Sequence, residues 1–385
     1  MKAWPRVALG ELLQDASEPV RVQQDAEYPN FGIYSFGRGL FAKPPISGMQ
    51  TSAGTLYRVR AGNFIYSRLF AFEGSYGLVD DAFDGHFTSN EYPSFSLDRS
   101  RLEPAFLKAY FQLPRVWQGI AMGSKGVGSR RIRVQPDKVL AHRIPLPPLA
   151  EQQAIVARLD ALAAKTREVE THLDAIERDA DRLVRSYIFH SRGEQHIKRP
   201  MSELVQQRPT DISVDRTTRY RFAGVYSFGR GVFPSVVKAG SEFAYERLST
   251  VRAGDFTYPK LMAWEGALGV VPPACDGMVV SPEFPVFTVD TDEVLPEVLD
   301  IYFRTPEVWP ALAELSGGTN VRRRRLQPSS FLGYEMPVPS KAAQLKVRAA
   351  FRHVQLLKAK HTAIREANAL LLPATLERVF VQPQS

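Results

Sequence analysis

Two arginine-rich segments carry the side chains best suited to contact a polyanion. They contain Lys125, Arg130, Arg131 and Arg133 in the first segment, and Arg322, Arg323, Arg324 and Arg325 in the second. A guanidinium group can neutralise a phosphate or form paired hydrogen bonds with the edge of a guanine. Solvated surface charge is the ordinary alternative. Because both segments also contain glycines and occupy matched places in the chain, we favour two loops that contact DNA.

A second candidate is a hexapeptide that occurs twice, as residues 34–39 and 226–231, with the sequence YSFGRG in both places. The glycines could form a tight turn and nothing more. Alternatively they let the backbone approach DNA closely, so that Ser35 and Arg38, and equally Ser227 and Arg230, contact it. No strand, glycine-rich turn and helix of the nucleotide-binding type surrounds the motif.

A third duplicated segment contains Arg68 and Glu73 in one copy and Lys260 and Glu265 in the other. The two cations are candidate contacts to phosphates or bases. The two glutamates could accept a hydrogen bond from a cytosine amino group, with a structural hydrogen bond as an equal alternative. The neighbouring aromatic residues are expected to pack in the core.

Catalytic and metal-binding patterns are missing from the sequence. It has no Walker lysine loop, HExxH, CxxC or GxSxG motif, and its seven histidines are scattered. With Cys275 as the one cysteine, neither an internal disulfide nor a cysteine-based metal site can form. We therefore expect a non-catalytic protein that binds no metal and no cofactor of its own.

The overall composition agrees with a protein that binds a polyanion. The 49 Lys and Arg residues outnumber the 41 Asp and Glu residues, giving a formal charge of +8, which does not distinguish nucleic acid from an acidic membrane. The sequence contains neither a signal peptide nor an apolar run long enough to span a bilayer. We expect a cytoplasmic protein that is not bound to a membrane.

A tandem duplication organises the chain. Tyr34 recurs as Tyr226, an offset of 192 residues (226 minus 34), and the same offset relates the Glu-Gly dipeptides at 73 and 265 and the arginine segments. We predict an α+β fold with two tandem-repeated domains of mixed helix and twisted sheet. The expected domains are residues 1–148 and 192–340, followed by long helices at 149–191 and 341–380.

The two long helices are expected to pair. Residues 149–191 contain no glycine or proline, and apolar or small residues recur in steps of four and three, as in a coiled coil. This seam comprises Ile155, Leu159, Leu162, Thr166, Val169, Leu173, Ile176, Ala180 and Leu183. The second helix continues the register at Val347, Phe351 and Val354, then drifts, and Pro373 should close or kink it. Antiparallel pairing would relate the two halves by a pseudo-twofold axis.

The chain resembles the specificity subunits of type I restriction-modification systems. The resemblance rests on the arginine loop, then the run IPLPPLAEQQ at residues 144–153, with Pro147, Pro148, Glu151 and Gln152, and then the long helix. It implies that the two domains are target-recognition domains, each of which reads half of a split site in double-stranded DNA. It also implies that the helices dock two methyltransferase subunits, which carry S-adenosylmethionine, and that motor-nuclease subunits join the complex.

The second copy departs from this motif, because Ser340 and Ala343 replace a proline and the glutamate while Gln344 is retained. The two docking sites are therefore not expected to be equivalent. Since the domains share their motifs, we predict half-sites that are related in sequence and inverted. The alternatives are a DNA-targeting adapter of another defence or methylation-only system, or a coiled-coil interaction scaffold whose basic loops are merely solvated.

Overall fold

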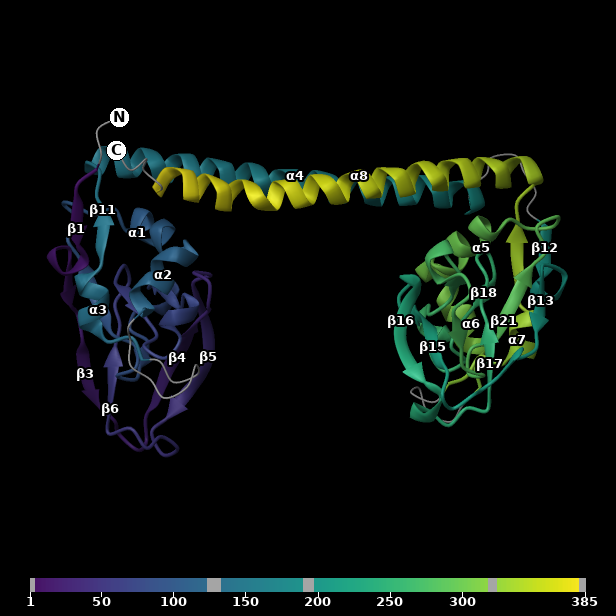
Figure 1. The fold of residues 1–385 in the computed structure, drawn as a ribbon, viewed down its shortest axis with the longest axis horizontal. Coiled ribbons are helices and arrows are strands. Elements are labelled where there is room, and N and C mark those ends of the chain that lie inside the picture. Colours follow the sequence, from purple (N-terminus) through teal and green to yellow (C-terminus); the bar gives the residue numbers. More distant parts are fainter. Residues whose placement is uncertain (1–3, 123–132, 190–196, 318–323, 381–385) are drawn as a thin grey trace. The chain divides into compact units, whose positions relative to one another are not determined.

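The computed structural model describes residues 4–122, 133–189, 197–317 and 324–380. The chain divides into two compact units: the first comprises residues 1–171 and 364–385, and the second comprises residues 172–363. Each unit contains one globular domain and parts of the two long helices, α4 (Leu149–Phe189) and α8 (Lys341–Phe380) (Figure 1). The predicted fold class, two mixed domains with two long helices, is confirmed.

The first unit contains three sheets. A pair of strands joins β1 (Arg6–Ala8) to β11 (Arg143–Pro145), and a four-stranded sheet has the order β2 (Leu13–Asp15), β10 (Ser94–Leu97), β7 (Phe64–Tyr66), β8 (Tyr76–Leu78). The five-stranded sheet has the order β3 (Glu18–Arg21), β6 (Thr55–Arg58), β9 (Phe87–Thr88), β4 (Glu27–Ile33), β5 (Leu40–Ser47). Only β4 and β9 pair in parallel among these strands.

Three short helices accompany these sheets, namely α1 (Pro104–Phe111), α2 (Pro114–Ala121) and α3 (Pro136–Ala141). Each begins with proline, whose missing N–H would be unpaired at a helix start in any case. The core between them is aromatic, with Phe64, Tyr76 and Phe111 packed ring against ring. At the end of α8, Phe380 packs against Phe106 of α1 and closes this core.

The second unit repeats the topology of the first. It pairs β12 (Ile197–Pro200) with β22 (Glu335–Val338), and its four-stranded sheet has the order β13 (Val205–Arg208), β21 (Val286–Val289), β18 (Phe256–Thr257), β19 (Gly269–Val270). The five-stranded order is β14 (Ile212–Ser213), β17 (Arg247–Thr250), β20 (Val279–Val280), β15 (Arg219–Tyr226), β16 (Gly231–Ala239). Its short helices are α5 (Pro296–Phe303), α6 (Trp309–Leu315) and α7 (Pro328–Leu332).

Beyond Leu173 the seam predicted along α4 is wrong at Ile176 and Leu183, whereas Ala180 does pack against the core of the second unit. Ile176 is 47% exposed and Leu183 is 57% exposed, whereas Val184 and Ile188 are buried. A straight α-helix has 3.6 residues per turn, so its buried face drifts by about 20° per heptad relative to a 3.5-residue repeat. The buried positions therefore move one residue onward along the helix.

Polar pairs occupy the seam where the apolar pattern weakens. In the second unit, Nδ1 of the buried His361 lies 2.8 Å from Glu177, and Lys358 forms an ion pair with Asp181 at 2.8 Å. In the first unit, Asn368 donates to the carboxylate of Glu170 and to the backbone oxygen of Thr166. The α4 partner falls from Asp181 to Glu177 between Lys358 and His361, and from Glu170 to Thr166 between Arg365 and Asn368. The helices are therefore antiparallel in both units. Buried polar pairs of this kind select one register.

Pro373 does not close the second helix, because α8 continues through it to Phe380. Proline inside a helix removes one backbone hydrogen bond. The residues that follow compensate for this loss, since Leu376 and Phe380 are both buried in the core of the first unit.

Candidate nucleic-acid interface

The duplicated hexapeptide forms the tip of a β-hairpin in each unit. The first hairpin loop, residues 34–39, joins β4 to β5, and the second hairpin loop, residues 226–231, joins β15 to β16 (Figure 1). Phe36 and Gly37 have left-handed φ angles of 62° and 64°, and Phe228 and Gly229 have 63° and 65°. The two loops therefore share one unusual backbone conformation, and the tight turn anticipated from the glycines is present in both copies.

Each hairpin loop is bound to a second turn that contains the duplicated Glu-Gly dipeptide. The backbone N–H groups of Phe36 and Gly37 donate to the backbone oxygens of Glu73 and Gly74, each at 2.8 Å. In the second unit, Phe228 and Gly229 make the same two bonds to residues 265 and 266, at 2.8 and 3.0 Å. Two candidate segments that lie far apart in the sequence thus form one rigid surface in each domain.

An arginine lies over an aromatic ring at the tip of each loop. The guanidinium carbon of Arg38 is 5.0 Å from the centre of the Tyr34 ring, and that of Arg230 is 4.6 Å from the Tyr226 ring. The Nε of each arginine donates to the backbone oxygen of its own loop, at Ser35 and at Ser227 respectively. Neither arginine forms an ion pair with a carboxylate in the described ranges. Their terminal amino groups remain available to an anion.

The serine and glutamate candidates differ between the two units. In the first, the Ser35 hydroxyl donates to the Glu73 carboxylate at 3.1 Å. Ser227 and Glu265 are half-buried at the matching positions, but their side chains form no such bond in the second unit. The structural role considered for Glu73 is thus observed, whereas contact of any of these residues with DNA stays a prediction.

An ion pair between Arg304 and Asp300 supports the second hairpin loop, and the first unit lacks this pair; we call it the Arg304 brace. Nε of Arg304 donates to the backbone oxygen of Gly229 at 2.6 Å, while another of its nitrogens binds the Asp300 carboxylate at 2.9 Å. Asp300 also accepts a hydrogen bond from the N–H of Val270. The matching residues of the first unit are Lys108 and Gln112. The two loops therefore share a conformation but not all of their supports.

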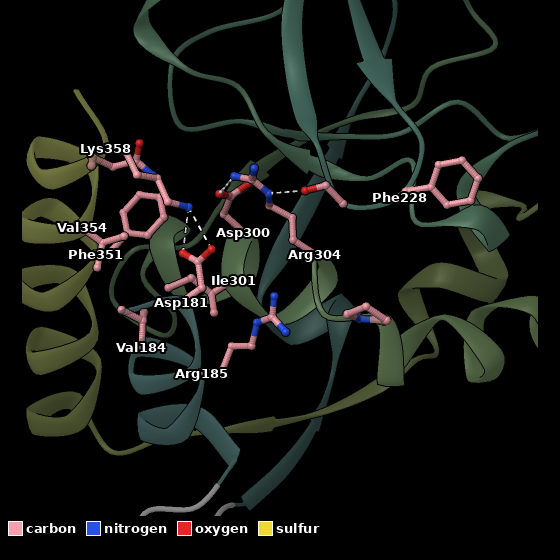
Figure 2. A pocket seen from close by; sticks show the side chains of 13 residues that line it. Asp181, Val184, Arg185, Phe228, Asp300, Ile301, Arg304, Phe351, Val354 and Lys358 are labelled. Carbon is pink, nitrogen blue, oxygen red and sulfur yellow. Dashed lines mark hydrogen bonds and ion pairs between the residues drawn. The ribbon is translucent and has the colours of Figure 1, made fainter. Parts of the chain in front are cut away.

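A cavity of about 190 Å³ lies beside this brace in the second unit, between α4, α5 and α8 (Figure 2). Its acidic side chains are already paired, Asp181 with Lys358 and Asp300 with Arg304. Arg185 also lines the cavity and forms no ion pair within the part of the chain that is described. Among the side chains that line this cavity, no nucleophile contacts a base.

Arg68 and Lys260, the cations of the third segment, are bound to protein atoms. One Arg68 nitrogen donates to the Gln135 side chain at 2.6 Å, and Lys260 donates to the backbone oxygen of Pro282 at 3.0 Å. Their backbone oxygens accept from Val134 and Leu326, which begin the chain segments that return from the arginine-rich loops. Both residues thus hold the base of these loops, and their contact with DNA stays a prediction.

The arginine-rich loops are described only near their ends. Arg133 forms an ion pair with Glu91 at 3.1 Å, and Arg325 pairs with Glu283 at the matching position, while Arg324 is half-buried. Backbone hydrogen bonds between Gly317 and Arg325 close the base of the second loop. Five predicted DNA contacts lie outside the described residues: Lys125, Arg130, Arg131, Arg322 and Arg323.

Gln152 and Gln344, predicted to dock a partner, are buried within their own domains. Gln152 accepts from the N–H of Glu103 and donates to the backbone oxygens of Arg101 and Pro147, each at 2.8 Å. Gln344 makes the same three kinds of bond in the second unit, at 2.8, 3.0 and 3.0 Å. Each glutamine fastens a long helix to the domain before it and offers no polar atom to a partner.

The remaining docking candidates divide by exposure. Pro147 is buried, whereas Pro148 and Glu151 are exposed at the start of α4, and Glu151 accepts a hydrogen bond from the Trp4 indole. In the second copy the Ser340 hydroxyl accepts from the N–H of Ala343, so the altered motif still caps its helix. Most seam residues of the two long helices are buried or half-buried by other parts of this chain: Ile155, Leu159, Leu162, Val169, Leu173, Val347, Phe351 and Val354.

One histidine is strongly perturbed. Burial, with a smaller contribution from the positive charge of Arg6, lowers the pKa of His142 to about 4. Its Nε2 lies 3.0 Å from the Tyr110 hydroxyl. In the second unit Tyr334 occupies the position of this histidine, and its hydroxyl forms a hydrogen bond with that of Tyr302, which occupies the position of Tyr110. A histidine held neutral against a tyrosine has a structural role here.

Two further groups of site residues were not selected from the sequence. The rings of Phe36 and Phe228 project from the loop tips, 61% and 65% exposed, although the motif that contains them was identified. The acidic partners in the helix seam, such as Asp181, were also missed. The signal available for the phenylalanines was the recurrence of the whole hexapeptide, including an aromatic residue between serine and glycine.

Within the described ranges, no group of three or more His, Cys, Asp or Glu side chains is arranged to hold a metal ion. None of the helices there has the length and apolar character needed to cross a bilayer.

Comparison with known proteins identifies the fold. No family model matches the chain, and no curated protein matches it. The crystal structure of the HsdS subunit from Thermoanaerobacter tengcongensis is similar over 98% of this chain and 96% of that one, with a TM-score of 0.55 and 19% identity. A chain from a study of complex assembly and conformational transition of the type I R-M system has a TM-score of 0.65 and 19% identity. That match covers 99% of this chain and 98% of the other.

The chain thus has the fold of type I restriction-modification specificity subunits over nearly its whole length, as the resemblance in sequence predicted.

Proposed function

We propose that this chain is the DNA-specificity subunit of a type I restriction-modification complex, with no catalytic activity of its own. Each domain reads one half of a two-part site in double-stranded DNA. Methyltransferase subunits bound to the chain supply S-adenosylmethionine and the transfer of a methyl group, and motor-nuclease subunits join the complex. The fold shared with the HsdS subunit supports this assignment.

The observation that carries the proposal is the hairpin loop present in both domains. In each copy an arginine with unpaired terminal nitrogens lies over an exposed tyrosine, on a backbone fixed by hydrogen bonds to a second turn. Arginine and an exposed aromatic ring are the combination with which proteins bind both the phosphates and the bases of DNA. A merely structural turn would not need either side chain at its tip.

The two half-sites are related in sequence and inverted. Arg38 and Arg230 occupy the same position in loops of the same conformation, so they present the same donors to DNA. The antiparallel contacts between α4 and α8 in both units support the inverted orientation. The Arg304 brace, which the first loop lacks, allows the two readings to differ in detail.

Partner docking involves exposed positions of the long helices rather than the buried glutamines. Pro148 and Glu151 are exposed at the start of α4. On α8 in the second unit, Leu345 and Leu356 are exposed and lie about three turns apart on one face, with Ala349 between them. Exposed apolar side chains on one face of a helix are available to pack against a partner subunit.

A selection experiment tests the proposed function. The full chain, co-purified with a methyltransferase subunit from the same host, is incubated with random duplex DNA, and the bound fraction is sequenced. We expect two short enriched blocks, separated by a fixed number of unspecified base pairs. Recovery of the complex without any enrichment would contradict the assignment.

Substitution of the loop arginines separates the two half-sites. Arg38→Ala should relax the sequence of one block and Arg230→Ala that of the other, because each change removes one set of donors. Arg21→Ala, which removes an exposed arginine at the end of β3, is the matched control and should leave both blocks unchanged. A loss of DNA affinity that is the same for all sequences would assign the arginines to phosphate contact and not to base readout.

A further inference from the structure

The most unusual backbone positions in the described part of the chain are Phe36 and Phe228. They are the only residues there other than glycine with a positive φ, at 62° and 63°. A side chain in this region is strained, and phenylalanine has no polar group with which to offset the strain locally. Retention of a strained residue points to a role for its side chain. Glycine would fit the same backbone without strain.

Both phenyl rings project from the protein surface. Phe36 is 61% exposed and Phe228 is 65% exposed, although each adjoins a well-packed domain. In the second unit, Figure 2 shows Phe228 across the pocket from Val354 and Phe351 of α8, with its ring directed away from that helix. The strain therefore does not serve to bury the ring in the domain or against the helix.

A tryptophan side chain supports each exposed phenylalanine. The Phe36 ring lies 6.1 Å from that of Trp117, and the Phe228 ring lies 6.4 Å from that of Trp309. Trp309 is itself held by a hydrogen bond from its indole to the backbone oxygen of Phe303. A Cβ at Gly74 would lie 2.8 Å from Trp117, so only glycine permits this close assembly of turn, tryptophan and loop. The support fixes the direction in which the phenyl ring points.

A cation lies beside the Phe36 ring, and each hairpin loop contains a second aromatic ring. The guanidinium carbon of Arg38 is 5.9 Å from the centre of the Phe36 ring, and Tyr34 packs against Phe41 at 4.3 Å. In the second loop, Tyr226 stacks on Phe233 at 3.7 Å beneath Arg230. In the first loop the phenyl ring is thus an apolar projection next to a cationic side chain.

We propose that Phe36 and Phe228 act as aromatic wedges, each entering the base stack of one half-site while the arginine of the same loop contacts the bases beside it. This inference rests on the proposed function. A phenyl ring has no hydrogen-bonding group with which to read a base edge, but it can stack on the face of any base. Inserted apolar side chains unstack a base step and kink the duplex.

A wedge contributes to specificity through the ease with which DNA deforms. Pyrimidine–purine steps unstack more readily than other steps, so each half-site should contain such a step at the position of the ring. The arginine and the loop backbone would then read the bases beside it. This predicts one flexible step at the same place in both enriched blocks.

Fluorescence of 2-aminopurine tests the wedge directly. The base analogue is placed at successive positions of the selected duplex, and fluorescence is measured on addition of the chain in complex with its methyltransferase. The wild-type complex should raise the signal several-fold at one step in each half-site. Phe228→Gly should abolish the rise in one half-site only and weaken binding about 10- to 100-fold. Phe36→Gly should do the same in the other half-site.

The substitutions are chosen so that loss of folding does not imitate loss of the wedge. Because glycine relieves the left-handed strain, both variants should unfold at a temperature no lower than that of the wild type. Phe228→Trp keeps a large ring and should retain the fluorescence rise. Tyr245→Ala, which removes another exposed aromatic side chain of the second unit, is the matched control and should change nothing.

Three results would overturn the proposal. Unchanged fluorescence and affinity in the glycine variants would show that the rings contact nothing in the complex. Loss of affinity without a wild-type fluorescence rise at any step would place the rings outside the base stack. Loss of the methyltransferase on purification would assign the rings to a protein interface. If the wild-type complex itself does not bind a specific duplex, the proposed function fails together with the wedge.

Discussion

The buried glutamine at the start of α4 provides the sharpest test of how each domain is held to its helix. Gln152→Met keeps the length of the side chain but removes three hydrogen bonds, leaving the N–H of Glu103 and the backbone oxygens of Arg101 and Pro147 without this partner. A buried polar group left unpaired costs about 1–3 kcal/mol. Since the side chain is completely buried, we expect a loss of about 3 kcal/mol in the free energy of unfolding of the first unit.

Calorimetry of the full chain measures this loss. In a unit of this size, about 3 kcal/mol corresponds to a fall of roughly 6–12 °C in the unfolding temperature. Gln153→Met changes the exposed neighbour and should have an effect within about 0.5 kcal/mol. Gln344→Met should reproduce the loss in the second unit, because its bonds are of the same kind.

The opposite pattern would refute the reasoning. If Gln152→Met left the unfolding temperature unchanged but prevented co-purification with the methyltransferase, the glutamine would be a docking residue, as the sequence motif suggested. Its hydrogen bonds within the domain would then contribute little to stability.

Two further changes test the first unit. The pKa of His142 is about 4 in the folded chain and about 6.5 in the unfolded chain. As pH falls, the unfolded chain therefore takes up a proton first, and the folded chain should lose stability between about pH 6.5 and pH 4. His142→Tyr, which places at this position the tyrosine found at the matching position 334, should reduce this acid sensitivity, measured as unfolding temperature against pH. An unchanged profile would exclude His142 as its cause. Gly74→Ala places a Cβ 2.8 Å from Trp117 and should cost more stability than Gly85→Ala, which has a similar φ but open space around it; equal losses would contradict the close packing inferred for the hairpin loop.

The architecture was predictable because it depends on patterns that the sequence displays directly. The offset of 192 residues identified two copies of one domain, and the absence of glycine and proline identified α4. The predicted seam failed at Ile176 and Leu183, because a repeat read as heptads accumulates an error along a straight helix. Ile176 is therefore exposed, and polar residues such as Glu177 take part in the contact.

The candidate site was predictable only in part, since the environment of a side chain depends on segments far away in the chain. Arg38 and Arg230 were chosen for their chemistry and do lie at loop tips with free nitrogens. Arg68 was chosen for the same reason, yet Gln135 occupies it. Gln152 was assigned to partner docking, and its burial could not be foreseen because the domain atoms that surround it come from distant positions. The exposure of Phe36 depends on a left-handed turn that favours glycine.

Mapping of DNA methylation tests the central claim most directly. The chain is expressed with its methyltransferase in a host that lacks other adenine methylation, and the genome is sequenced by a method that detects the modified base. Two copies of one domain predict a single motif with two short blocks, related in sequence, inverted, and separated by a fixed spacer. A continuous motif, or two blocks with unrelated sequences, would contradict the account.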